Sequence, residues 1–217
     1  NNTGIGYNAL LSNTTGDGNT AIGFESLLSN NIGQGNTGSG WRALQNNTSG
    51  SGNTANGYQS LMNNSGGEGN TALGYQALVN NVTDGNTATG YQALQNNTSG
   101  TENTATGYRA LNGNQTGISN TATGYQAMLF NNNGERNTAN GTRAFMNNAS
   151  GSGNTATGYQ TLMNNEIGND NTAMGEEAMI NNVDGGENAA VGTRAMNNNT
   201  SGAGNTAMGY QALFNND

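Results

Sequence analysis

The stretch Asn86–Asn97 reads Asn-Thr-Ala-Thr-Gly-Tyr-Gln-Ala-Leu-Gln-Asn-Asn, and a short polar tail leads from it to the next copy at Asn103. The chain consists of thirteen copies of this phrase. Eleven of the twelve intervals between copies are 17 residues, and one, from Asn70 to Asn86, is 16. A period this strict indicates one structural unit stacked on copies of itself. Positions are numbered below from the first Asn of each copy; the copies begin at Asn2, Asn19, Asn36, Asn53, Asn70, Asn86, Asn103, Asn120, Asn137, Asn154, Asn171, Asn188 and Asn205.

Composition excludes several classes of function. The 217 residues include no Cys, His, Pro or Lys, five Arg, and a formal net charge of −8. Without Cys and His, the usual metal ligands and the usual general base are missing, so we expect no enzyme and no cofactor. Five Arg cannot form a basic footprint for nucleic acid. No segment approaches the ~20 apolar residues of a membrane-spanning helix.

The domain organisation follows from the repeat. The array covers residues 1–217 without a linker or a change of composition, which predicts a single repeat domain. The sequence begins and ends within the repeat, so we expect it to be a fragment of a longer fibre.

Within one copy, Thr-Ala-x-Gly predicts a short strand, with the small residues at positions 3 and 5 on its inner side. The segment after it, Tyr-x-Ala-Leu-x-Asn, fits either a second strand or a short helical turn, and we favour the strand. Asn at position 12 and Gly at position 15 predict turns. Seventeen residues are too few for a βαβ unit, so the chain is expected to be an all-β parallel solenoid or β-roll of 13 stacked coils.

Stacking places identical residues above one another, so side-chain amides at position 12 can pair along the stack. The only large residue that is apolar in every copy is at position 9, which is little for a free-standing coil, so we expect a homo-oligomer, either a trimer or a filament. The predicted ladder of structural Asn side chains comprises Asn13, Asn30, Asn47, Asn64, Asn81, Asn97, Asn114, Asn131, Asn148, Asn165, Asn182, Asn199 and Asn216.

Two stretches carry a resemblance to known families: Asn-Thr-Ala-Ile-Gly-Phe at Asn19–Phe24 and Asn-Thr-Ala-Leu-Gly-Tyr-Gln-Ala-Leu at Asn70–Leu78. They resemble the NTAxGYxAL arrays of bacterial and phage tail-fiber-domain surface proteins. The Thr-Ala-Ile-Gly core is more distantly similar to the head repeats of YadA-type trimeric autotransporter adhesins, which are left-handed parallel β-rolls with a shorter coil. The resemblance implies a left-handed, trimeric shaft or head of an extracellular fibre, located at a cell surface or on a virion.

Ten copies carry an aromatic residue at position 6. This column could be a flat stripe that stacks on sugars of a cell-surface glycan, or a structural ladder of stacked rings that stiffens the rod, which we favour. The residues proposed as a ligand-stacking column are Trp41, Tyr58, Tyr75, Tyr91, Tyr108, Tyr125, Tyr159 and Tyr210.

Two further surfaces are candidates for binding. Thr at positions 2 and 4, as in Thr87/Thr89 and Thr104/Thr106, could order water and bind ice, but position 4 is apolar in other copies. Weak Ca²⁺ binding is possible at acidic residues in the turns, which lack the spacing of a dedicated calcium loop. These residues are Asp17, Glu68, Asp84, Glu102, Glu135, Asp170 and Glu187. The expected function is a structural fibre, with a carbohydrate-binding or ice-binding repeat surface as the alternative.

Overall fold

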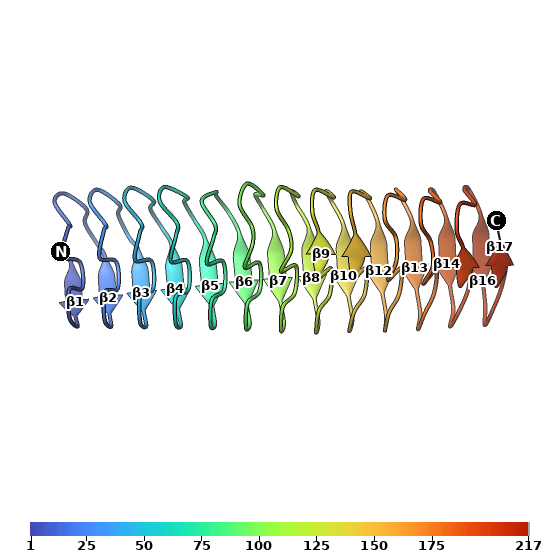
Figure 1. The fold of residues 1–217 in the computed structure, drawn as a ribbon, viewed down its shortest axis with the longest axis horizontal. Helices are drawn as coiled ribbons and strands as arrows, with labels where there is room; N and C mark the ends of the chain where they lie inside the picture. The colour runs from blue at the N-terminus through green and yellow to red at the C-terminus, as the bar shows by residue number, and fades with distance from the viewer. Residues whose placement is uncertain (217) are drawn as a thin grey trace.

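The computed structural model describes residues 1–216 as a row of coils, each built from a three-residue strand and a set of turns, with a second, two-residue strand in four of them and no helix among these residues. The coils lie side by side from the N-terminus to the C-terminus (Figure 1). One strand from each coil enters a 13-stranded sheet in which all neighbours are parallel and consecutive copies pair. The predicted all-β parallel solenoid of thirteen coils is therefore confirmed.

The long sheet is formed by β1 (Thr3–Ile5), β2 (Thr20–Ile22), β3 (Thr37–Ser39), β4 (Thr54–Asn56), β5 (Thr71–Leu73), β6 (Thr87–Thr89), β7 (Thr104–Thr106), β8 (Thr121–Thr123), β10 (Thr138–Asn140), β12 (Thr155–Thr157), β13 (Thr172–Met174), β14 (Ala189–Val191) and β16 (Thr206–Met208). Two short parallel pairs lie elsewhere on the coil and are formed by β9 (Phe130–Asn131) with β11 (Asn147–Asn148) and by β15 (Asn198–Asn199) with β17 (Asn215–Asn216).

Register is the same at every junction, because each strand covers positions 2 to 4 and pairs position by position. Thr87 faces Thr104, for example. The 16-residue copy keeps this register, since Thr71 still faces Thr87. The missing residue is absorbed in the turn, where the carbonyl oxygen of Thr83 accepts hydrogen bonds from Asn70 Nδ2 and Asn81 Nδ2, both at 2.7 Å. In the eleven other coils that reach position 15, a Gly provides this carbonyl.

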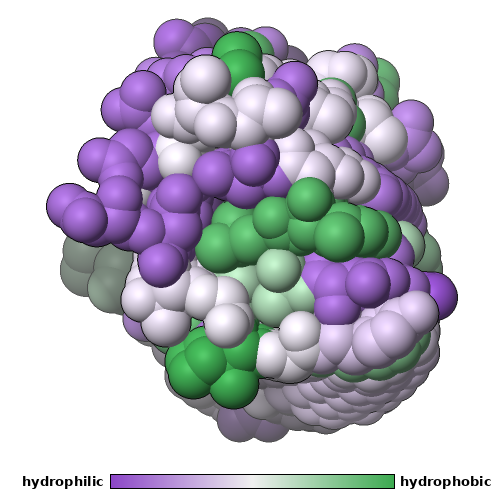
Figure 2. Space-filling model, turned by 90° about the vertical axis from the view of Figure 1, so that its left-hand side faces the viewer, coloured by the Kyte–Doolittle hydropathy of each residue, from purple (hydrophilic) through white to green (hydrophobic). Residues whose placement is uncertain are grey.

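The core is closed within one chain. Side chains at positions 3, 8 and 9 face the inside, and in the interior coils they have almost no exposed surface, as with Ala88, Ala93 and Leu94. The first and last coils leave this core partly open: Figure 2, which looks at the N-terminal end, shows a hydrophobic strip crossing the coil between polar residues. Since neighbouring coils bury the apolar residues, a thin core does not by itself require the expected partner chains.

Most of the second segment is neither the favoured strand nor the alternative helix; only its end, at position 11, pairs as a strand, in β9, β11, β15 and β17. Positions 6 to 9 form turns, and positions 7 and 9 adopt the left-handed conformation in every coil, as at Gln92 (φ 53°) and Leu94 (φ 50°). This backbone turns Ala93 and Leu94 inward together, which the alternation of a strand cannot do. Left-handed non-glycine residues cost about 1–2 kcal/mol each. Hydrogen bonds to both neighbouring coils offset that cost: Gln92 N donates to Tyr75 O at 2.9 Å, and Leu94 N donates to Ala110 O at 3.0 Å.

Position 5 also differs from the prediction. Its Gly lies just beyond the strand and outside the core, with φ near +130° in all coils. A Cβ on Gly107 would lie 2.4 Å from the carbonyl oxygen of Gly124, so the missing side chain allows the next coil to approach along the rod. Position 3 does face the core, as expected.

Candidate functional surfaces

The aromatic residues at position 6 form a continuous stack over the first eight coils, from Tyr7 to Tyr125. Neighbouring ring centroids are 4.7–5.9 Å apart and their planes lie within 12° of parallel. The guanidinium carbon of Arg42 lies 4.1 Å from the centroid of the Trp41 ring. Offset parallel rings at this separation attract one another beyond the area that they bury.

Stacking determines which part of each ring a ligand can reach. Inside the stack both faces of a ring such as Tyr91 are covered by neighbouring rings, and the edge and hydroxyl make up its 42% exposed surface. Five residues of the proposed ligand-stacking column, Trp41 through Tyr108, are in this arrangement, and Tyr125 ends the stack with one face covered. The other two, Tyr159 and Tyr210, lie beyond Thr142, and no ring of residues 1–216 stacks on them. A sugar could therefore stack face-on against the end rings of the stack, Tyr7 and Tyr125, and against Tyr159 and Tyr210.

Asn side chains at position 12 form the ladder that the sequence indicates. Each Nδ2 donates to the Oδ1 of the preceding coil's Asn at 2.5–3.4 Å in eleven of the twelve junctions. Asn165 Nδ2 lacks the ladder bond and keeps the hydrogen bond to the position-15 carbonyl that the other coils also make, here to Gly168 O at 2.8 Å. The side chains of interior coils are fully buried, and their amides are satisfied by one another and by the turn.

A second Asn ladder, at position 1, is absent from the predicted site residues. At all twelve junctions the backbone N of this Asn donates to the Oδ1 of the preceding one, at 2.8–3.0 Å. Both ladders converge on the carbonyl at position 15; Gly117 O, for example, accepts from Asn103 Nδ2 at 2.8 Å and from Asn114 Nδ2 at 3.0 Å. The signal in the sequence was the presence of Asn at position 1 in all thirteen copies.

The outer faces carry Thr and charged residues in register. Thr87/Thr89 pairs with Thr104/Thr106 across β6 and β7. At position 7, Arg42 Nε lies 2.8 Å from Glu25 Oε2, and Arg194 Nε lies 2.7 Å from Glu177 Oε2. The hydrogen bond that Arg194 Nε donates to Glu177 raises the pKa of the Arg194 guanidinium, which stays charged. Glu177 thus has a structural partner in the next coil.

Acidic residues of the turns do not converge. In the described part of the chain, no three Asp or Glu side chains gather closely enough to hold a metal ion. The expected weak Ca²⁺ binding stays a prediction. Within residues 1–216 no helix is long and apolar enough to cross a membrane.

Comparison with family models, with curated proteins and with solved structures found no match to this chain. The resemblance to fibre arrays therefore stays an expectation.

Proposed function

We propose that this chain is a structural shaft, a stiff rod that spaces or displays other parts of an extracellular fibre. The observation that supports this most is the uniformity of the junctions. Each of the twelve has a strand pair in the same register and a position-1 Asn hydrogen bond. No coil interrupts this pattern, so the rod has no hinge in its backbone. Twelve junctions at about 4.8 Å give a rod of roughly 60 Å.

The proposal includes an extracellular location at a cell surface or on a virion, and a homotrimer. Both rest on the resemblance of Asn19–Phe24 and Asn70–Leu78 to fibre arrays. Exposed apolar residues at position 4, such as Ile22, Met174 and Val191, are compatible with contacts between chains.

Electron microscopy together with small-angle scattering of the full chain tests the rod. We expect straight particles that extend about 60 Å per chain. Compact or flexible particles would contradict the shaft. Sedimentation equilibrium tests the trimer separately, since the chain mass is 22.1 kDa and the trimer requires three times that mass.

A second candidate function is ice binding on the long sheet. The observation that favours it is the in-register array of Thr at positions 2 and 4 in β6, β7, β8 and β12. The array is interrupted by Asn140 in β10 and gives way to Met174 and Val191 further on. Thermal hysteresis in solutions of the chain that is lost in the variants Thr106→Val and Thr123→Lys would support ice binding. An absence of hysteresis would exclude it.

A further inference from the structure

One part of the rod departs from the repeat at several neighbouring positions. Position 11 is Asn in nine coils, yet it is Gly113 in the seventh coil and Phe130 in the eighth. Position 13 has its shortest side chain, Ala149, in the ninth coil, between Asn132 and Glu166. In an array this regular, exceptions that coincide in space indicate a local role.

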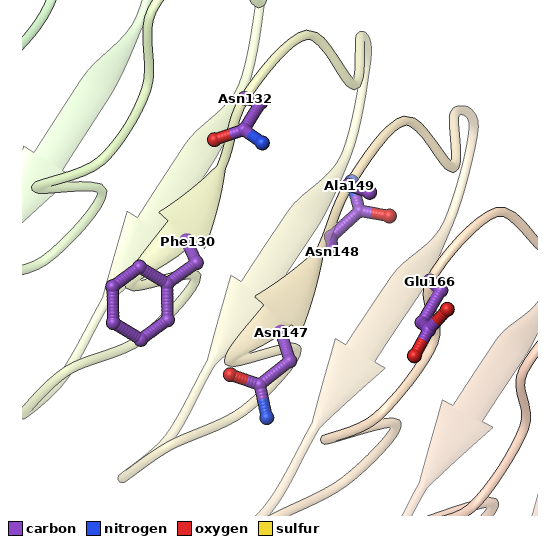
Figure 3. A pocket seen from close by; sticks show the side chains of 6 residues that line it. All are labelled: Phe130, Asn132, Asn147, Asn148, Ala149 and Glu166. Carbon is purple, nitrogen blue, oxygen red and sulfur yellow. The ribbon is translucent and has the colours of Figure 1, made fainter.

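These exceptions produce a hollow on the side of the rod. It has a volume of about 290 Å³ and is lined by Phe130, Asn132, Asn147, Asn148, Ala149 and Glu166. Figure 3 shows these side chains on three successive coils, with Phe130 and Asn147 on adjacent coils and Glu166 on the next. Ala149 leaves the space between Asn132 and Glu166 open, and the volume is at the lower end of small-molecule sites.

Phe130 presents an apolar surface to this hollow. Its side chain is 52% exposed, although most residues at position 11 are polar. Gly113 makes room for it: a Cβ there would lie 3.4 Å from Phe130 Cδ1 and 2.9 Å from Leu129 O. The absence of a side chain at Gly113 therefore leaves room for the ring beside the preceding coil.

The polar groups around the ring have unused capacity to accept hydrogen bonds. Elsewhere the position-11 Asn residues form a chain, as when Asn46 Nδ2 donates to Asn63 Oδ1 at 3.0 Å. Asn147 Nδ2 donates onward to Asn164 Oδ1 at 2.9 Å, but Phe130 before it has no side-chain donor. Asn147 Oδ1 points to the Phe130 side in Figure 3. Within residues 1–216, the Glu166 carboxylate and the Asn132 amide have no side-chain hydrogen bond either.

We propose that this hollow binds one ring of a neutral sugar in the pyranose form. The C–H face of the sugar would lie against the Phe130 ring, whose negative face attracts C–H groups. Its hydroxyl groups would donate to Asn147 Oδ1 and to the Glu166 carboxylate, which lies two coils from Phe130, or about 10 Å along the rod. The Glu166 charge and the net charge of −8 disfavour acidic sugars. This proposal does not depend on the shaft function or on the position-6 column.

Ligand-observed saturation-transfer NMR on the full chain tests the proposal, with methyl glycosides of glucose, galactose and mannose as probes. We expect transfer to at least one of them. Phe130→Asn should weaken binding on the order of 10-fold, because it removes the stacking surface and gives Asn147 a donor. This variant is expected to fold, since nine coils already have Asn at this position.

Matched variants separate the hollow from other surfaces. Tyr159→Asn removes the alternative sugar-stacking ring outside the hollow, and the transfer that Phe130→Asn weakens should persist in this variant. Glu166→Gln should raise the binding of the methyl glycoside of glucuronic acid relative to the wild type. The proposal is overturned if none of the three neutral glycosides receives transfer, if Phe130→Asn binds as well as wild type, or if only Tyr159→Asn loses binding. Preferential binding of benzyltrimethylammonium over the glycosides would also overturn it, because it would assign the hollow to cations.

Discussion

At the scale of single residues, the constraints of this fold act between coils more than within them. Position 5 admits only Gly because of the carbonyl of the next coil, and position 1 requires Asn because one amide serves two coils. Neither constraint is visible in one copy alone. The repetition of Gly at position 5 and of Asn at position 1 indicates that both residues are required, and the structure gives the reason.

Gly107→Ala is expected to be strongly destabilising. Its Cβ would lie 2.4 Å from Gly124 O at a φ of +132°, so the two coils would have to separate. We expect a loss of at least about 3 kcal/mol in the free energy of unfolding, measured with urea. Gly69→Ala is the control, because a Cβ there meets nothing within 4 Å at a φ of +64°. A loss below about 1–2 kcal/mol is expected for it, and equal losses would contradict the steric explanation.

Asn103→Ala should be nearly as costly. The Asn103 Oδ1 accepts from the backbone N of Asn120 at 3.0 Å, and its Nδ2 donates to Gly117 O at 2.8 Å, all without access to water. Removing the amide leaves the buried Asn120 N–H unpaired, which costs about 1–3 kcal/mol, whereas Gly117 O keeps the hydrogen bond from Asn114 Nδ2 at 3.0 Å. Asn96→Ala is the matched control, since this exposed amide makes only hydrogen bonds of 3.4 Å. Urea unfolding of both variants gives the comparison. A similar destabilisation in both would show that the burial of the amide does not determine the loss of stability.

At the scale of the element, the sequence predicts the first half of each coil and not the second. The strand at positions 2 to 4 follows from Thr-Ala-x-Gly, and β1 to β8 lie there as expected. The turns at positions 6 to 9 could not be derived, because residues such as Gln92 and Leu94 do not favour positive φ by themselves. Their conformation is stabilised by backbone hydrogen bonds to two other coils, which no local propensity encodes.

The break in the aromatic stack offers a test of how much the rings contribute. Thr142→Tyr would place a ring between Tyr125 and Tyr159 and extend the stack by two contacts. We expect a gain of about 1–2 kcal/mol in the free energy of unfolding. Thr193→Tyr adds only one contact, with Tyr210, because Glu176 lies on its other side. Urea unfolding should show roughly half the gain for Thr193→Tyr. An equal or larger gain would indicate that the exposure of the new side chain or the conformational propensity of Tyr, and not ring stacking, determines the change in stability.

At the scale of the whole molecule, the sequence was sufficient for the architecture because period, register and coil number are all properties of the repeat. It was not sufficient for the hollow beside Phe130, which arises from side chains in three coils that are unremarkable one at a time. The predicted aromatic column likewise needed the structure to show that its ring faces are covered by one another.

A solenoid of equivalent junctions should tolerate the removal of a whole unit. Deletion of residues 104–120 joins Asn103 to Thr121, so that β6 would pair with β8 in the usual register. We expect a cooperatively unfolding rod that is shorter by about 5 Å, as seen by scattering and circular dichroism. Deletion of residues 104–112, which is about half a unit, is the control and should disrupt the coils on both sides. Equal damage from both deletions would contradict the equivalence of the junctions.

The stacked rings have an optical consequence. From Tyr7 to Tyr125 the column is a line of chromophores in near contact, and it contains the only Trp of the chain, Trp41. Light absorbed by these tyrosines should migrate from ring to ring and be emitted at the longer wavelength of Trp41. The ratio of tyrosine to tryptophan emission then reports whether the stacked coils are intact. The intrinsic fluorescence of the rod therefore measures the integrity of the ring stack without an added label.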